Sequence, residues 1–295
     1  MKLDLIIPLK SNLLSLAINN TIPSLIKNIS FNNIYIVTKK DNFEAIKNAL
    51  GNTVICLDEN KILDGLILNN IQEYFKKRNV DYNRAGWYFQ QFLKLSISKL
   101  NFITNLYLVW DADAVALKPI QFISKDDKVF LEKTKEHHKP YFITLEKLIG
   151  LKKQVNFSFI AEYLVFDKEI VKEMLLKISK NKNWWFDVLD KIDSVNLEKS
   201  GFSEYETYGN YVSKFYKERF IIRNLNKTRK GVRFLGKQPS EKGLKLFSYV
   251  YDYMSFEQWH KKYTPLPIRV VAIFFSLFIG IIKKSKSSSK TLISF

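Results

Sequence analysis

The sequence predicts an α/β fold: a mostly parallel central sheet flanked by helices, followed by a C-terminal helical tail that associates with a membrane. Two observations predict the sheet, namely the alternating strand and helix patterns over residues 3–57 and the unbroken apolar run at 106–110. The third observation is an uncharged segment at 270–282. We therefore expect one domain over residues 1–259 and a basic, apolar tail over 260–295.

The composition is that of a globular, strongly basic protein. With 295 residues, 46% of them apolar, the chain can bury one large or two small cores, which excludes wholesale disorder and a small disulfide scaffold. Cys56 is the single cysteine, so no intramolecular disulfide is expected, and no Cys/His cluster has zinc-ligand spacing. The net charge of +18 favours an anionic partner, but lysine is abundant throughout and can equally reflect the base composition of the coding DNA.

The first 57 residues read as β-α-β-α-β. Short β-rich apolar runs predict the strands, and helical periodicity between them predicts the helices, the second of which is closed by Gly51. In sheets of this kind, ligands bind outside the carboxyl ends of the strands. Neither a dinucleotide-binding glycine motif nor a P-loop lies near those ends, so phosphates would be held in another way. The expected strands are 3–9, 33–38 and 53–57, and the expected helices are 12–29 and 42–50.

Two helical patterns follow, at residues 66–78 and 84–100, and the second carries two distinct faces. Apolar residues at positions 89, 93, 97 and 100 form one stripe, which is expected to pack. Trp87, Gln91 and Lys94 share another face at spacings of four and three. That face either borders a cleft or leaves Lys94 in solvent, as on an ordinary amphipathic helix.

The apolar strand 106–110 runs directly into the acidic motif Asp111-Ala112-Asp113. Two carboxylates two positions apart in an extended segment point the same way and repel each other unless a cation lies between them. Mg²⁺ and Mn²⁺ suit such oxygen ligands and leave coordination positions for phosphate oxygens, and the small Ala112 leaves room for a ligand. The alternative is a turn with two solvated aspartates.

One acid interrupts the next predicted strand. After a short apolar run at 142–145, residues 158–166 read as a strand and 168–177 as a helix. Glu162 lies inside that strand, where a charged side chain is costly unless it is paired or functional. The sequence leaves two interpretations open, a cleft residue and a structural ion pair.

A helix is expected to begin at Ser203, with Glu206 at the capping-box position three residues later. Glu204 and Tyr208 stand four residues apart on one face of this helix, and Glu206 points away from that face. We therefore select Glu204 as the carboxylate and Tyr208 as a neighbour in the cleft. The histidines at 137, 138 and 260 have no activating partner in the sequence and are expected in solvated loops.

The N-terminus lacks the pattern of a secretory signal, so a cytoplasmic protein is expected. Segment 270–282 is shorter than the ~20 residues of a spanning helix and has basic residues on both sides. An apolar helix with basic flanks suits the anionic inner face of the cell membrane. The alternative is a helix docked on the protein's own core.

Five ordered segments give the chain a resemblance to the nucleotide-sugar-dependent glycosyltransferases of the GT-A fold. Within that group it resembles the uncharacterised bacterial DUF6492 family, which is often found with capsule and lipopolysaccharide genes. The resemblance covers about residues 1–215 and extends more loosely to 259. The matching segments are IIPLK, GWYFQQFLKL, WDADAV, FIAEYLVFDKEIV and FSEYETYGNYV.

The resemblance implies a site for a divalent metal and a nucleotide-sugar donor, most simply a UDP-sugar. The two aspartates of the acidic motif would hold Mn²⁺ or Mg²⁺, and the end of the first strand would line the nucleotide pocket. A carboxylate from the second half, here Glu204, would serve as general base in an inverting transfer. No late histidine clearly matches the third metal ligand of some GT-A families, and His260 is a weak substitute. The implied donor-site residues are Pro8, Leu9, Lys10, Asp58, Gln91, Lys94, Asp111 and Asp113.

The expected function is therefore metal-dependent sugar transfer to a saccharide or lipid-linked acceptor in surface polysaccharide synthesis. The mechanism expected is stabilisation of the diphosphate leaving group by the metal and Lys94, with proton removal by Glu204. A sugar-nucleotide pyrophosphorylase is one alternative, although its glycine-rich, basic loop is absent after Leu9. A nucleic-acid-binding protein is another, but the basic residues are spread along the chain and no nucleic-acid motif is present, so we expect no nucleic-acid partner.

Overall fold

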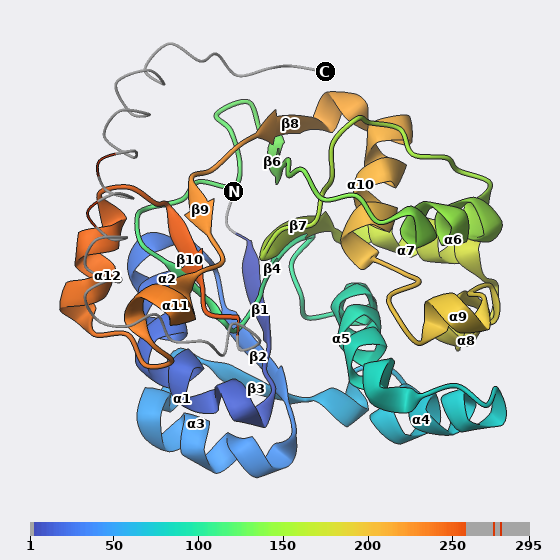
Figure 1. Cartoon of the computed structure of the whole chain (residues 1–295), viewed down its shortest axis with the longest axis horizontal. Coiled ribbons are helices and arrows are strands. Elements are labelled where there is room, and N and C mark those ends of the chain that lie inside the picture. The colour runs from blue at the N-terminus through green and yellow to red at the C-terminus, as the bar shows by residue number, and fades with distance from the viewer. Residues whose placement is uncertain (1–2, 258–273, 275–277, 279–295) are drawn as a thin grey trace.

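A five-stranded sheet forms the centre of the molecule (Figure 1). The computed structural model describes residues 3–257 together with 274 and 278. The strand order is β3-β2-β1-β4-β7; the first four strands run parallel and β7 runs antiparallel to β4. The prediction of a mostly parallel central sheet is confirmed. The strands are β1 (Asp4–Pro8), β2 (Ile34–Thr38), β3 (Ile55–Asp58), β4 (Leu106–Trp110) and β7 (Tyr163–Asp167).

Burial explains why these segments are strands. Every residue of β1, β2, β4 and β7 is buried, as expected for strands covered by helices on both faces. The edge strand β3 is partly exposed. The buried carboxylate of Asp4 accepts hydrogen bonds from the backbone N–H groups of Thr104 (2.8 Å) and Asn33 (3.1 Å), which ties together the loops that lead into β4 and β2. The apolar pattern of the sequence is therefore sufficient to predict the sheet.

Two groups of helices enclose the sheet (Figure 1). On one side lie α1 (Leu14–Leu16), α2 (Ile22–Asn28) and α3 (Phe43–Leu50), joined there by two late helices, α11 (Gly231–Leu235) and α12 (Glu241–Ser248). The remaining helices lie on the other side. They are α4 (Leu68–Lys77), α5 (Ala85–Ser96), α6 (Lys139–Ile149), α7 (Lys168–Ile178), α8 (Trp184–Asp190), α9 (Ser194–Leu197) and α10 (Glu204–Phe215).

Two elements differ from the sequence-based prediction, and a third segment had no assigned structure. The helix expected over 12–29 is divided by a π-helical turn at Ala17–Thr21. The run 142–145 lies inside α6, and the strand expected over 158–166 begins only at Tyr163. Residues 158–162 instead form a loop anchored by Ser158, whose hydroxyl donates to Glu206 at 2.5 Å. A run of four or five apolar residues can be a strand, part of a helix or a buried loop. The contacts that decide between these structures come from distant parts of the chain, so the run alone does not distinguish them.

The chain returns to the carboxyl edge of the central sheet through two small sheets. Strand β5 (Ala114–Ala116) pairs with β10 (Tyr253–Ser255), which also pairs with β9 (Lys227–Thr228). Strands β6 (Val129–Glu132) and β8 (Phe220–Arg223) form the second pair. Residues 227–255 therefore lie beside the segment that follows β4.

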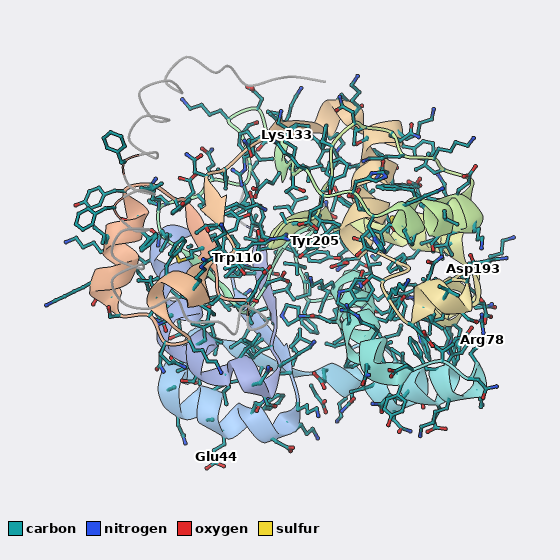
Figure 2. The ribbon with its side chains drawn as sticks, viewed as in Figure 1. Glu44, Arg78, Trp110, Lys133, Asp193 and Tyr205 are labelled. Atoms are coloured by element: carbon teal, nitrogen blue, oxygen red, sulfur yellow. The ribbon has the colours of Figure 1, made fainter. Side chains whose placement is uncertain are left out.

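Large aromatic side chains fill the interior next to β4. Figure 2 shows Trp110 and Tyr205 near the centre of the molecule, while Glu44 and Asp193 lie at its periphery. The Trp110 ring stacks on Tyr163, with centroids 5.2 Å apart, and its indole N–H donates to the Ala114 carbonyl at 2.7 Å. The last residue of β4 therefore holds the chain on both sides of the acidic motif.

No helix within the described residues is long and apolar enough to span a bilayer. The predicted membrane-associating segment 270–282 lies outside those residues except at positions 274 and 278, and so does His260. Phe274 and Phe278 are helical and exposed.

The close approach of α10 to the 158–162 loop yields a test of the packing. A Cβ added to Gly209 would lie 2.2 Å from the ring of the buried Phe159. We expect Gly209→Ala to lower the free energy of unfolding by about 1–3 kcal/mol, because the core must shift to admit the methyl group. Chemical denaturation measures this change.

Gly86→Ala in α5 is the matched control, because a Cβ there meets nothing within 4 Å. Alanine in a helix is favoured over glycine by about 0.5–1 kcal/mol, so this variant should be unchanged or more stable. Equal effects at Gly86 and Gly209 would contradict the packing described.

Candidate active site

The acidic motif lies at the carboxyl end of β4 and is anchored from three directions. The Asp111 N–H donates to the Glu162 carbonyl at 2.8 Å, and the Phe256 N–H donates to the Asp113 carbonyl at 2.7 Å. The Thr21 hydroxyl donates to the Ala112 carbonyl at 2.8 Å. Because these contacts engage the backbone, both aspartate side chains are left available for other partners.

Lys94 links the motif to helix α10. Its Nζ lies 2.9 Å from Asp111 Oδ1 and 3.0 Å from Glu204 Oε1, and the side chain is only 6% exposed. It also donates to the Tyr205 hydroxyl at 3.1 Å. Burial alone would lower the pKa of Lys94, but the carboxylates of Asp111 and Glu204 raise the pKa well above its ordinary value. The ammonium therefore stays charged and holds three elements, α5, the end of β4 and α10, around one point.

Glu204 is buried rather than exposed in an open cleft. Its side chain is 5% exposed and points at Lys94, and its backbone N–H donates to Gln91 Oε1 at 3.1 Å. Burial raises the pKa of Glu204, although Lys94 works against that rise. The helix begins as predicted, since the Ser203 side chain accepts from the Glu206 N–H. The structure brings Gln91, Lys94, Asp111 and Glu204 together, with Gln91 holding the start of α10.

Asp113 is a half-buried carboxylate with three other acids around it. Burial raises its pKa to about 7, and Asp111, Glu257 and Glu162 add to the rise. No lysine or arginine of the described residues forms an ion pair with it. A divalent cation would relieve this repulsion, so carboxylate oxygens in this setting fit Mg²⁺ or Mn²⁺. The described residues contain no group of three or more His, Cys, Asp or Glu arranged to hold a metal, so a bound ion would need further oxygen ligands from water or phosphate.

A cavity of about 310 Å³ includes Lys10, which interacts electrostatically with Asp111 and Asp113, although neither aspartate lines the cavity. Its walls are the end of β1 (Pro8, Leu9 and Lys10) and one face of α5 (Gly86, Phe89, Gln90 and Leu93), with Glu59 beyond the end of β3. Burial lowers the pKa of Lys10, as does the charge of Lys94, while Asp111 and Asp113 oppose the change. The volume of this cavity lies at the lower end of the range for small-molecule sites.

The face of α5 toward the cavity is not the one predicted. The stripe containing Phe89 and Leu93, expected only to pack, lines the cavity together with Gln90. Trp87 is half-buried and stacks on Tyr141, with centroids 6.3 Å apart and planes 15° apart. Asp58 accepts from the Asn60 N–H at 3.0 Å, and Glu59 rather than Asp58 lines the cavity. The two faces of a helix cannot be assigned without knowing which side the sheet covers.

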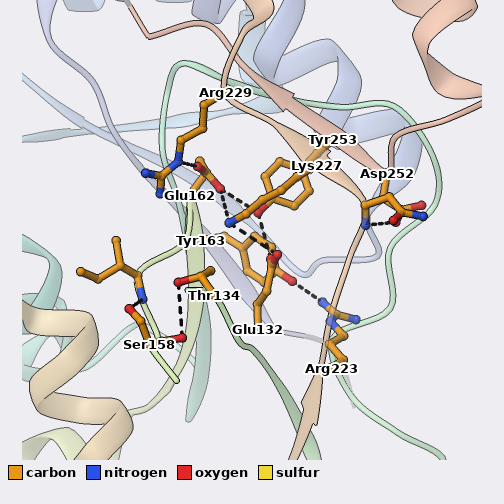
Figure 3. Close-up of polar contacts among 12 residues, drawn as sticks. Glu132, Thr134, Ser158, Glu162, Tyr163, Arg223, Lys227, Arg229, Asp252 and Tyr253 are labelled. Atoms are coloured by element: carbon orange, nitrogen blue, oxygen red, sulfur yellow. Dashed lines mark hydrogen bonds and ion pairs between the residues drawn. The ribbon is translucent and has the colours of Figure 1, made fainter. Parts of the chain in front are cut away.

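Glu162 and Tyr208 are structural. Figure 3 shows Glu162 at the centre of a buried network, where it contacts Arg229, Lys227 (2.9 Å) and the Tyr253 hydroxyl (2.7 Å). Burial raises the pKa of Glu162, but the two cations outweigh this and hold it below its ordinary value. Tyr208 is fully buried, and its hydroxyl accepts from the Asp167 N–H at 2.9 Å. The ion-pair interpretation therefore holds for Glu162, and the placement of Tyr208 in a cleft is corrected.

Sequence reasoning missed the late residues around the motif. Arg229 contacts Glu136 and lies 3.5 Å from Glu257, whose pKa burial raises to about 7. No local pattern marks these positions, because they reach the motif only when the chain folds back through β9 and β10. The two described histidines have other contacts: His137 stacks on Phe142, and His138 Nε2 lies 2.8 Å from the Ser200 carbonyl.

The comparisons with known proteins identify a family. The family of unknown function DUF6492 matches residues 1–232. No curated protein sequence matches significantly. Among solved structures, mouse xyloside xylosyltransferase 1 in its apo form has a TM-score of 0.47 at 11% identity, covering 87% of this chain and 98% of that one. The galactosyltransferase LgtC in complex with donor and acceptor sugar analogs has a TM-score of 0.47 at 11% identity, covering 93% and 96%.

The ion cluster around Lys94 generates a stability prediction. Lys94→Met leaves Asp111 and the buried Glu204 without their common cation, so we expect a loss of about 3–5 kcal/mol in the free energy of unfolding. Adding Glu204→Gln removes the stranded charge and should restore part of that loss. A double-mutant cycle by chemical denaturation measures the coupling. Strictly additive effects of the two substitutions would contradict the cluster described.

Proposed function

We propose that this chain, which belongs to the DUF6492 family, is a glycosyltransferase that uses a divalent metal and a nucleotide-sugar donor. The observation that carries the proposal is Asp113, a half-buried carboxylate that is crowded by Asp111, Glu257 and Glu162 and interacts electrostatically with Lys10, a residue of the cavity wall. Such an arrangement costs stability in the free protein and is useful when a cation and an anionic ligand bind there together. Five segments that resemble GT-A glycosyltransferases support it independently.

The donor, which we propose to be a UDP-sugar, would occupy the cavity beside β1. Phe89 and Leu93 offer an apolar wall for the base and ribose, and Gly86 lets the ligand approach the α5 backbone. Lys10 stands between this cavity and the acidic motif, where its ammonium would meet the diphosphate. Glu59, which follows β3 and lines the cavity, would face the base.

Asp111 and Asp113 would hold Mn²⁺ or Mg²⁺. When bound, the metal supplies positive charge that stabilises the diphosphate as it leaves. Lys94 fixes the orientation of Asp111 through the 2.9 Å contact and adds positive charge behind it. The carboxylate of Glu204 forms an ion pair with Lys94. We therefore assign Glu204 first as a positioning residue that acts through that lysine.

The general-base role of Glu204 in an inverting transfer stays a prediction. It requires the carboxylate to leave Lys94 and reach the acceptor hydroxyl, and its raised pKa favours proton uptake once it does so. Trp87, half-buried and stacked on Tyr141, is our candidate contact for the acceptor. We propose a saccharide or lipid-linked acceptor of surface polysaccharide synthesis, such as capsule or lipopolysaccharide.

Asp113→Asn tests the metal site. Purified protein should slowly hydrolyse a UDP-sugar when Mn²⁺ is present, and the variant should lose this activity because one carboxylate ligand is gone. Release of UDP measures it, and Glu44→Gln, an exposed change far from the motif (Figure 2), is the control. Hydrolysis that persists without metal, or formation of a nucleotide sugar from a nucleoside triphosphate, would contradict the proposal.

The same variant should be more stable than the wild type in metal-free buffer at pH 8. Folding raises the pKa of Asp113 to about 7, so its ionised form destabilises the native state above that pH. Near pH 5 the group is protonated in the native protein, and the difference should shrink. Thermal melts at both pH values measure it. A metal-free variant that is less stable at pH 8 would mean that Asp113 is a structural residue.

The location of the protein is a separate proposal. We propose a cytoplasmic enzyme bound to the inner face of the cell membrane through residues 260–295, whose sequence joins an apolar run to basic flanks. The exposed Phe274 and Phe278, four positions apart, support this. Deleting residues 265–295 should move the protein from the membrane fraction to the soluble fraction while donor hydrolysis is retained. Unchanged fractionation would contradict the proposal.

A further inference from the structure

A second cavity, of about 410 Å³, lies between the C-terminal half of α7, the loop before β4 and the segment that precedes α8. We call it the lysine cavity, because Lys99, Lys172, Lys180 and Lys182 line it and no aspartate or glutamate does. Its loop leads into the amino end of β4, whereas the acidic motif follows the carboxyl end of that strand. The two sites are therefore separated by the length of the strand.

Three of the four lysines of the cavity have no carboxylate partner within the described structure. Lys172 pairs with Glu169 at 2.8 Å. The nearest polar partner of Lys99 is the Lys182 carbonyl at 3.5 Å, and no carboxylate of the described residues forms an ion pair with Lys99, Lys180 or Lys182. Burial lowers the pKa of Lys99, as expected for an ammonium that has lost water without gaining a counter-ion.

A further lysine, Lys168, adds positive charge near the lysine cavity. The buried Lys168 donates to the carbonyls of Leu100 (2.6 Å) and Ile103 (3.0 Å) and so holds the loop that carries Asn101 into the cavity wall. Burial lowers the pKa of Lys168 as well. Lys168 does not line the cavity itself, but its ammonium lies behind the loop of the cavity wall and adds positive charge to this region.

The neutral polar residues of the cavity, Ser179 and Asn181, are already ordered in the free protein by hydrogen bonds. Asp187 accepts from the Ser179 hydroxyl and from Asn181 Nδ2 (3.2 Å), and the Asn181 N–H donates to Ser179 Oγ at 2.9 Å. The nearby acid is therefore engaged in fixing the loop rather than in pairing with the lysines. An ordered loop with several lysines around it can bind an anion without a large ordering cost.

We propose that the lysine cavity binds the phosphate group of a phosphorylated ligand, at a site separate from the active site. Several ammonium groups and side-chain amides offer many hydrogen-bond donors. A phosphate, which has more oxygens than a carboxylate, is therefore the ligand that suits them better. The cavity also has an apolar side, formed by Leu175, Trp184 and Leu176, the last of which is 68% exposed. Two sources share this chemistry, a free phosphorylated molecule and the headgroup of an anionic phospholipid.

Calorimetric titration of the full-length protein with inorganic phosphate, at constant ionic strength, tests the site. Lys99→Gln and Lys180→Gln should each weaken binding at least fivefold, because each removes a charge that the cavity leaves unpaired. Lys125→Gln, a change of the same charge at an exposed loop outside the cavity, is the matched control and should bind as the wild type does. Lys99→Arg should retain most of the affinity.

Flotation with vesicles of phosphatidylcholine, with and without phosphatidylglycerol, separates the two sources. Reduced binding of Lys180→Gln to the anionic vesicles, relative to Lys125→Gln, identifies a lipid headgroup, and unchanged vesicle binding with weakened phosphate binding identifies a free ligand. Because all variants keep the same C-terminal tail, its contribution cancels. Equal phosphate affinity in all variants, or no phosphate binding by the wild type, overturns the proposal. Lys180 is exposed, so its substitution is not expected to disturb folding.

Discussion

The ammonium of Lys94, held between Asp111 and Glu204, is the interaction on which the candidate active site depends. It joins a helix that precedes β4, the turn that follows β4 and a helix from the second half of the chain. A buried ion cluster of this kind is weak evidence for stability, because desolvation cancels much of the attraction. Its clear consequence is orientation: Lys94 holds one oxygen of Asp111 and so fixes this carboxylate two positions before Asp113.

The late segment of the chain completes the same region. Through Lys227, Arg229 and Tyr253 it neutralises the buried Glu162, whose carbonyl anchors Asp111 (Figure 3). The contrast between the two acids is informative. Glu162 has its cations and a lowered pKa, whereas Asp113 has no ion pair with a described residue and a pKa raised to about 7. An unbalanced charge that the fold maintains beside a cavity is typical of a site that awaits its ligand.

Sequence reasoning succeeded where a property repeats along the chain and failed where it depends on a distant partner. The first four strands of the central sheet and the start of α10 at Ser203 followed from local patterns, whereas the placement of Lys94 at the site was implied by the family resemblance. Glu162 and Tyr208 did not, because the partners that make them structural lie 41 or more positions away. The cavity-facing side of α5 was also missed, since both of its faces contact other elements.

The amino-acid order by itself determined the mostly parallel sheet and the position of the acidic motif, because apolar periodicity and strand ends are local properties. Tertiary structure alone decided which of the described carboxylates are paired with cations, which half-buried one is crowded by other acids, and where lysines gather around a cavity. Those outcomes depend on the electrostatic field and burial at each side chain. Both are set by residues far apart in the sequence that become neighbours only when the chain folds back on its sheet.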